Sequence, residues 1–144
     1  MSDEHYSRVW ASVWAEPWDN DMKLLAIYLL TGPKRRTEGL YRLPLEYAMG
    51  DLKWPLKKVR DVLSKLEAED FAEYDKETQL VLVLKALKRH GLNDNQIKGV
   101  VKAFAQLPES PLRNRFASLS QEFNKKLAKA LAEACQRNGA TLEK

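Results

Sequence analysis

The sequence predicts a mainly α-helical protein with one small β-hairpin, and three observations lead to this fold class. Apolar residues recur at helical spacing along several segments of the 144-residue chain, which is the main sign of amphipathic helices. Two short apolar runs, 71–75 and 80–87, are separated only by the polar residues KETQ, and this pattern predicts a hairpin. Hydrophobic residues make up 44% and charged residues 31% of the chain, as in globular rather than disordered proteins.

The first long helix is predicted in the segment NDMKLLAIYLLTGP. It begins with Asn20 or Asp21 as N-cap, and Gly32 and Pro33 stop it. The segment is apolar on nearly all sides, so we expect the helix to be buried. The polar loop KRRTE follows it.

A strand and two further helices are predicted next. Residues 39–44, GLYRLP, alternate apolar and polar side chains as a short strand does. Residues 44–52, PLEYAMGDL, form a short helix with Pro44 in its first turn. A third helix follows the turn KWP. Its apolar residues recur at helical spacing, at Leu56, Val59, Leu63 and Leu66.

Helix, strand, helix, helix and hairpin is the order of elements in a winged helix-turn-helix. In that fold the helix before the hairpin is the recognition helix and the hairpin is the wing. We therefore predict a winged helix-turn-helix domain with an N-terminal arm over residues 1–90, followed by a C-terminal helical extension over residues 91–144. In the extension, one helix is capped near Asn93 and stops at Pro108, and one or two more end at Gly139.

Charge is unevenly distributed along the chain, although the net charge is only +4. Residues 31–66 hold nine basic and four acidic residues, and residues 80–144 hold twelve basic and five acidic. Between them, residues 67–79 hold one basic and six acidic residues, and residues 1–30 hold two and five. Two basic segments flanking an acidic one favour a polyanionic partner.

The third predicted helix would turn its apolar face to the core and its basic face to the groove of DNA. The preceding basic loop could clamp phosphates beside it. The residues predicted to contact duplex DNA are Lys34, Arg35, Arg36, Lys53, Lys57, Lys58, Arg60, Ser64 and Lys65. Because lysines bind phosphates more than they read bases, we expect sequence-tolerant or origin-directed binding. The alternative is a solvated helix face and a solubilising loop.

The hairpin has the opposite charge. Its arms and tip carry Glu73, Asp75 and Glu77 against only Lys76. A wing that grips the minor groove is normally basic. We therefore expect this hairpin not to bind DNA and to face a protein instead.

Four tryptophans could stack on bases or fill a core. Large aromatic side chains mostly serve cores, so we expect Trp10, Trp14 and Trp18 to pack over the first helix and the sheet. Trp54, at the turn into the basic helix, is the one retained as a DNA-contact candidate.

No motif of the sequence predicts an enzyme, a cofactor or a metal site. A glycine-rich phosphate loop is absent, and His5, His90 and Cys135 lack metal-ligand spacing. Cys135 is expected to pack on the apolar stripe of the last helix. The single cysteine excludes an internal disulfide, which fits a cytoplasmic protein. The acidic N-terminus is no signal peptide, and no apolar run approaches the ~18 residues that a membrane span needs.

The end of the chain carries an apolar stripe that must bury against something. It consists of Leu119, Phe123, Leu127, Leu131 and Ala134. Two interpretations stay open: the stripe folds back on its own domain, or it pairs with a second copy of the chain.

The segment VWAEPWDNDMKLLAIYLLTGP, with GLYRLPLEYAMGDL after it, resembles the N-terminal domain of phage replication initiation or replication-organiser proteins, which are similar to DnaD-like primosome proteins of bacteria. The resemblance covers residue 6 to about residue 115. Its motif residues are Trp14, Glu16, Pro17, Lys23–Leu25, Tyr28–Thr31, Gly39–Tyr41, Leu43, Pro44, Tyr74 and Asp75. The segment NDNQIKGVVKAFAQLPESPL also resembles the family.

The resemblance implies a DNA-binding winged helix in replication initiation, in the cytoplasm of a bacterium or a bacterial host. Duplex DNA, a replication protein and a second copy of the chain are the expected partners, and no membrane. Two alternatives remain: a protein-interaction module and a transcriptional regulator of the same fold. A groove binder should gather positive charge on the basic helix and the KRR loop together, whereas an interaction module should leave an exposed apolar strip.

Overall fold

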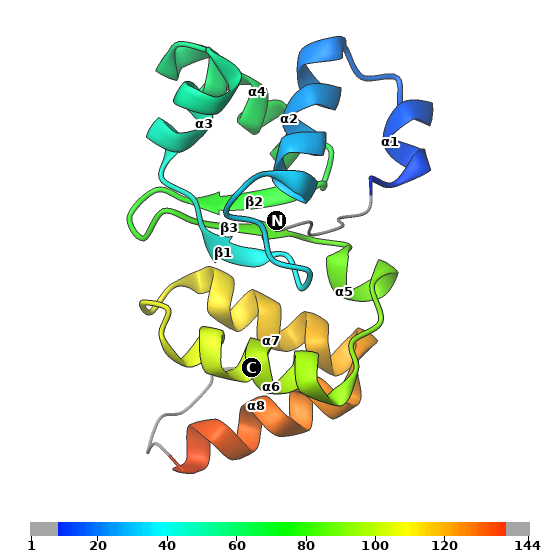
Figure 1. The fold of residues 1–144 in the computed structure, drawn as a ribbon, viewed down its shortest axis with the longest axis vertical. Coiled ribbons are helices and arrows are strands. Elements are labelled where there is room, and N and C mark those ends of the chain that lie inside the picture. The colour runs from blue at the N-terminus through cyan, green and yellow to red at the C-terminus, as the bar shows by residue number, and fades with distance from the viewer. Residues whose placement is uncertain (1–8, 138–144) are drawn as a thin grey trace, which may run out of the picture.

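The computed structural model describes residues 9–137, with side chains as far as residue 134 (Figure 1). Over these residues the helices are α1 (Ala11–Ala15), α2 (Asn20–Thr31), α3 (Leu45–Leu52), α4 (Leu56–Ala68), α5 (Ala86–Arg89), α6 (Asp94–Ala105), α7 (Pro111–Phe123) and α8 (Lys125–Arg137). The strands are β1 (Leu40–Arg42), β2 (Ala72–Asp75) and β3 (Leu80–Val83). The predicted mainly helical chain with a small sheet is confirmed.

The three strands form one antiparallel sheet in the order β1-β3-β2. The predicted hairpin is confirmed, with Tyr74 opposite Val81. The second strand of the hairpin, however, is shorter than the predicted run 80–87. The strand stops at Val83, and residues 86–89 turn into α5, because Leu87 is buried in the core on the far side of the sheet.

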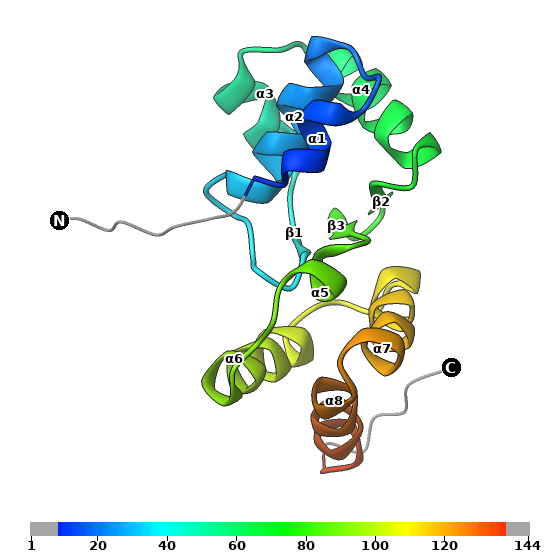
Figure 2. The ribbon, with the colours of Figure 1, turned by 90° about the vertical axis from the view of Figure 1, so that its right-hand side faces the viewer.

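The sheet lies between two layers of helices. Helices α1 to α4 cover one face, and α5 to α8 cover the other (Figures 1 and 2). Successive strand residues point to opposite faces, so Val81 and Val83 join the core under α1 to α4 while Leu80 and Leu82 join the core over α5 to α8. All of β3 is therefore buried, and the predicted C-terminal extension completes the second core.

Helix α2 is the centre of the first core, and it is buried on most sides as predicted. Its N-cap is Asp19, whose carboxylate accepts a 2.8 Å hydrogen bond from the Met22 backbone N–H. The helix therefore begins one residue earlier than a cap at Asn20 would set it, and two residues earlier than a cap at Asp21 would. Tyr41 ties β1 to this helix, because its hydroxyl donates a 2.7 Å hydrogen bond to the Leu29 carbonyl.

The tryptophan predictions hold only in part. Trp10 and Trp18 are buried, at 7% and 9% exposed, but Trp14 is 61% exposed, so its predicted packing role is wrong. Trp10 lies in extended backbone before α1, and the inward-facing residue of this short helix is Val13. The one-turn spacing of Trp10 and Trp14 therefore does not put them on one face. Trp54, retained as a DNA-contact candidate, is buried at 9% exposed, which is a second correction.

The C-terminal apolar stripe folds back on its own chain. Asn124 interrupts it and caps α8, accepting a 3.0 Å hydrogen bond from the Leu127 backbone N–H. Leu127 and Leu131 are then fully buried in the core over α5 to α8, so the face that the sequence offered for pairing is used internally. Phe123 is left partly exposed. The side chain of Cys135 lies outside the described residues.

Candidate nucleic-acid interface

Helix α4 lies on the other side of the sheet from α6 and α8 (Figures 1 and 2), and its basic side is exposed. It begins after Pro55 and has one strongly apolar side. Val59, Leu63 and Leu66 are buried and Leu56 is partly buried, so the predicted core face is confirmed. The opposite side exposes Lys57, Arg60, Asp61, Ser64 and Lys65, and Lys53 is exposed at the preceding turn.

Carboxylates accompany two lysines at the ends of this face. Lys57 Nζ lies 3.0 Å from Asp61 Oδ2, and Lys65 Nζ lies 3.4 Å from Asp19 Oδ2. These lysine side chains stay 88% and 57% exposed. Exposed ion pairs contribute only about 0–1 kcal/mol, so a DNA phosphate can replace either carboxylate at small cost.

Lys58 is held more firmly than the other lysines of α4. Its ammonium lies 3.4 Å from the carboxylate of Asp21 and 4.6 Å from the ring centre of Trp54. A cation over an indole gains about 0.5–1 kcal/mol beyond the ion pair. Lys58 therefore ties α4 to α2 and is the least available of the cations predicted on α4.

A groove of about 220 Å³ lies between α4, the start of α3 and the β2–β3 turn. Arg60 and Ser64 line it from α4, and Lys76 and Gln79 line it from the turn. The Arg42 guanidinium reaches the same turn, donating a 2.6 Å hydrogen bond to Gln79 Oε1. The groove also holds two carboxylates, those of Glu46 and Glu67.

Two basic residues at this turn were not among the predicted site residues. Lys76 lines the groove itself, and Arg42 reaches it only through its bond to Gln79. Arg42 carries one sequence signal, since it is the polar position of the alternating segment GLYRLP. Lys76 was discounted because its neighbours are acidic. That Lys76 and Arg60 line one groove depends on how the hairpin folds against α4, which no local pattern reveals.

Arg36 of the KRR loop contacts the C-terminal layer instead of lying beside α4, contrary to expectation. Lys34 lies 5.4 Å from the ring centre of Tyr47 on α3. Arg36, by contrast, contacts Glu38 at 2.5 Å and donates a 3.4 Å hydrogen bond to the Gly99 carbonyl of α6. Glu38 explains the position of Arg36. This residue is only 4% exposed, and a buried carboxylate needs a cation beside it. Arg35 lines a pocket between this loop and α5–α6.

Two acidic side chains of the hairpin contact the C-terminal layer of the same chain. The Glu73 carboxylate lies 3.5 Å from Arg115 Nε on α7. Asp75 Oδ2 accepts hydrogen bonds from Ser110 Oγ at 2.6 Å and Thr78 Oγ1 at 2.7 Å. These carboxylates therefore have an intramolecular role, whereas the sequence suggested that they face another protein.

We expect the Asp75 contacts to make stability depend on acid pH. The Ser110 hydroxyl, and then the Thr78 hydroxyl, hold the pKa of the Asp75 carboxyl below its ordinary value of 3.8, because both bonds favour the ionised form. With the folded-state pKa depressed, this stabilisation is present above the ordinary value and is lost as pH falls through the folded-state pKa. Asp75→Asn should therefore be less stable than wild type at neutral pH, by an amount that shrinks as pH falls below the ordinary pKa of 3.8.

The measurement is urea unfolding of both proteins across that pH range. Glu77→Gln is the matched control, because it removes a carboxylate from an exposed position of the same turn. It should follow wild type throughout. A constant difference between Asp75→Asn and wild type at every pH would contradict the assignment.

Other kinds of site find little support in the described part of the chain. Among residues 9–137, no group of three or more His, Cys, Asp or Glu side chains is placed to hold a metal ion. None of the described helices has the length and apolar character needed to cross a membrane. Comparisons with protein-family models, curated proteins and solved structures give no match for this chain.

Proposed function

We propose that this protein is a winged-helix duplex DNA-binding protein in phage or plasmid-type replication initiation, with α4 as its recognition helix. The order α2-β1-α3-α4-β2-β3 and the sheet order β1-β3-β2 support the winged helix. The replication role rests on the resemblance of YLLT and GLYRLP to phage replication proteins. A transcriptional regulator of this fold would use the same surface.

One observation carries the DNA-binding proposal. The solvent side of α4 exposes Lys57, Arg60 and Lys65 beside a groove whose other wall holds Lys76. Such a side binds the phosphate backbone through its cations and leaves few groups to read base edges. Binding should therefore be salt-dependent and tolerant of sequence.

The test compares duplex binding at two salt concentrations. Lys57→Ala/Arg60→Ala should weaken affinity on the order of a hundredfold at low salt, since each charged hydrogen bond to phosphate contributes about 1.5–3 kcal/mol and the exposed Lys57–Asp61 pair offsets at most about 1 kcal/mol. The slope of log affinity against log salt should fall by about two, one for each lost phosphate contact.

The matched control is Lys85→Ala/Lys88→Ala, which removes two exposed cations at α5. It changes the net charge equally and should keep the wild-type slope. Equal losses in both variants would mean that the net charge, and not α4, governs binding. Unchanged affinity in the α4 variant would reject the proposal.

A protein-interaction module is the second candidate, and one observation favours it. Trp14 on α1 is 61% exposed and Leu24 on α2 is 44% exposed. The two helices pack together, and the Lys23 ammonium donates a 3.1 Å hydrogen bond to the Trp14 carbonyl. Exposed tryptophans are frequent anchors of protein interfaces.

A further inference from the structure

A second concentration of positive charge lies on α6 and α8. These helices belong to the layer on the opposite face of the sheet from α4 (Figures 1 and 2). Five lysines on them are exposed: Lys98, Lys102, Lys125, Lys126 and Lys129. Only two carboxylates occur within the bounds of these helices, those of Asp94 and Glu133.

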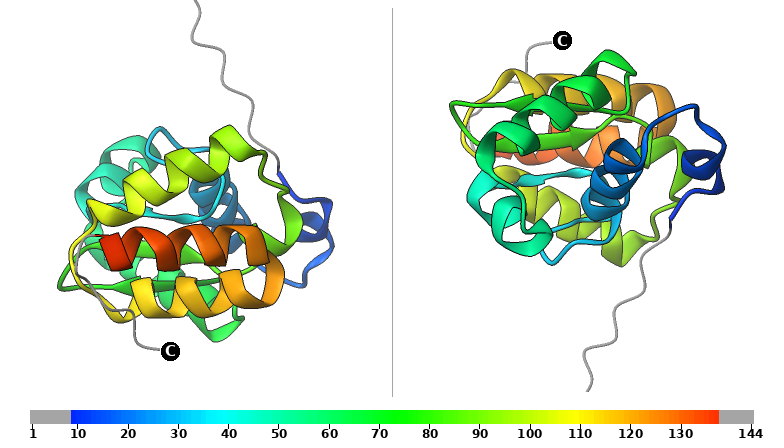
Figure 3. Two further views of the ribbon diagram at one scale, coloured as in Figure 1. Left: turned by 90° about the horizontal axis from the view of Figure 1, so that it is seen from below. Right: turned by 90° about the horizontal axis from the view of Figure 1, so that it is seen from above.

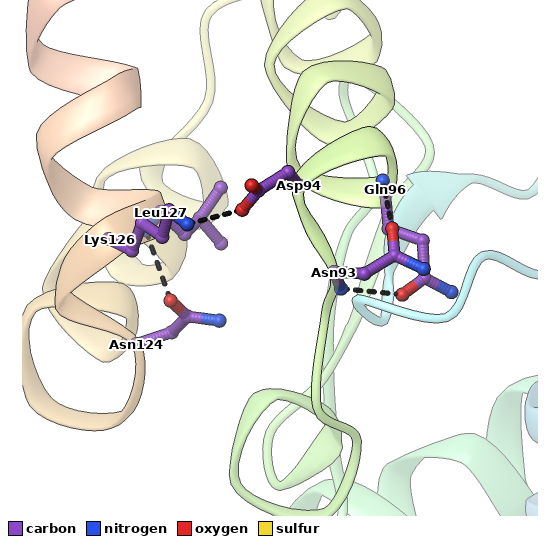
Figure 4. A network of polar contacts seen from close by, with 6 residues as sticks. All are labelled: Asn93, Asp94, Gln96, Asn124, Lys126 and Leu127. Atoms are coloured by element: carbon purple, nitrogen blue, oxygen red, sulfur yellow. Dashed lines mark hydrogen bonds and ion pairs between the residues drawn. The ribbon is translucent and has the colours of Figure 1, made fainter.

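The two helices run side by side in the same direction, each starting at the same end of the layer (Figure 3). Their N-termini are joined by an ion pair between Lys126 and Asp94 (Figure 4). Asn93 and Asn124 cap the two helices there, accepting hydrogen bonds from the backbone N–H groups of Gln96 at 2.8 Å and Leu127 at 3.0 Å. The surface is therefore fixed at this end by side-chain contacts.

The lysines form two rows on the solvent side of this layer. Ile97 and Phe104 of α6, like Leu127 and Leu131 of α8, are buried towards the sheet. Lys98 and Lys102 follow one another by one helical turn, as do Lys125 and Lys129, so each row has cations about 5–6 Å apart at Cβ. Packed helices lie about 8–10 Å apart, which sets the distance between the rows.

The exposed residues of α6 and α8 indicate which kind of ligand this surface would bind. The large exposed apolar residues in the described chain are Val9, Trp14, Leu24, Tyr47 and Phe123, and none lies on α6 or α8. A membrane-surface helix needs apolar side chains to insert, and a specific protein interface needs buried anchors. Rows of lysines without anchors suit a regular polyanion, and the phosphate backbone of duplex DNA is one.

We infer that α6 and α8 form a second duplex-DNA surface and that one chain bridges two duplex segments. The two surfaces lie on opposite sides of the sheet, so a duplex on α4 leaves α6 and α8 accessible. The bridging step rests on the proposed function of α4, whereas binding at α6 and α8 does not. Bridging by one chain needs no second copy, which fits the use of the C-terminal stripe inside the chain.

The experiment mixes two short duplexes, one carrying a fluorescent donor and the other an acceptor, with the full chain. Wild type should bring them together and bind two duplexes per chain at saturation. Lys98→Glu/Lys129→Glu should remove the donor–acceptor signal, keep binding of one duplex within about threefold, and lower the salt slope of total binding by about two. Lys85→Glu/Lys88→Glu reverses the same number of charges at α5 and should keep the signal.

A third variant separates this inference from the proposed function. Lys57→Glu/Arg60→Glu should also lose the signal but keep one duplex, bound through α6 and α8. If this variant instead keeps the signal, the α4 proposal fails and the bridging step fails with it. Loss of all binding in Lys98→Glu/Lys129→Glu would then still establish α6 and α8 as a DNA surface.

Three results would overturn the inference. One is a donor–acceptor signal that survives Lys98→Glu/Lys129→Glu, as it would if an oligomer bridged through several α4 helices. Another is a wild-type stoichiometry of one duplex per chain. The last is a Lys98→Glu/Lys129→Glu variant that loses binding to anionic phospholipid vesicles but keeps duplex bridging, which would assign the surface to a membrane.

Discussion

Replacing Phe116 by alanine should lower the free energy of unfolding by about 3–5 kcal/mol, the cost of removing a buried phenylalanine side chain. Phe116 is 0% exposed and lies in the core between the sheet and the helices α5–α8. Its ring lies 5.9 Å from that of Phe104 on α6, so the substitution opens a cavity between α6, α7 and the strands. Urea unfolding followed by circular dichroism measures the loss.

Phe123→Ala is the matched control, since it makes the same substitution at the end of the same helix. Phe123 is 38% exposed, and changes at such positions usually cost less than about 1 kcal/mol. If Phe116→Ala leaves no folded protein, Phe116→Leu keeps most of the buried volume and should show a smaller loss. Equal losses for Phe116→Ala and Phe123→Ala would contradict the placement of α7 on the sheet.

Local periodicity was enough to predict the longer helices and the hairpin. The stripe Leu56, Val59, Leu63 and Leu66 of α4 follows helical spacing because one side of the helix meets the core. The hairpin was predictable for a similar reason, since a short polar run separates two strand-forming runs. The boundary after Val83 was missed, because a short apolar run is compatible with either a strand or a helix. The short helix α1 was not predicted either.

What covers each apolar face could not be predicted, because the partners are distant in the sequence. Leu127 and Leu131 show by their spacing that one side of α8 is buried. Their cluster contains Leu40 and Leu80, residues of the sheet far earlier in the chain. A second copy would have satisfied the same periodicity, so the sequence left both interpretations open.

The ion pairs of the candidate site could not be predicted either, for the same reason. Composition predicted a basic face on α4, and the structure exposes that face. Composition does not show that Asp19 and Asp21, near the start of α2, lie beside Lys65 and Lys58. Nor does it show that Arg36 reaches a backbone carbonyl 63 residues away. Ion pairs between elements depend on tertiary packing, and they decide which of the predicted cations are available to DNA.

Trp18→Ala and Trp14→Ala should have very different effects, although the two residues are close in the sequence. Trp18 is 9% exposed. Its indole N–H donates a 3.2 Å hydrogen bond to Glu69 Oε1, and its ring meets Phe71 edge-on at 5.6 Å. Removing it should cost about 3–5 kcal/mol of unfolding free energy and leave the Glu69 carboxylate without this donor.

Trp14, at 61% exposed, has little packing to lose, so Trp14→Ala should stay within about 0.5 kcal/mol of wild type. Thermal and urea unfolding of both variants measure the contrast, and duplex affinity is measured alongside. Affinity should be unchanged in Trp14→Ala, because α1 lies outside the α4 groove. A Trp14→Ala protein that keeps its stability but loses duplex affinity would make Trp14 a DNA contact, and one that loses stability as Trp18→Ala does would show that its indole is packed.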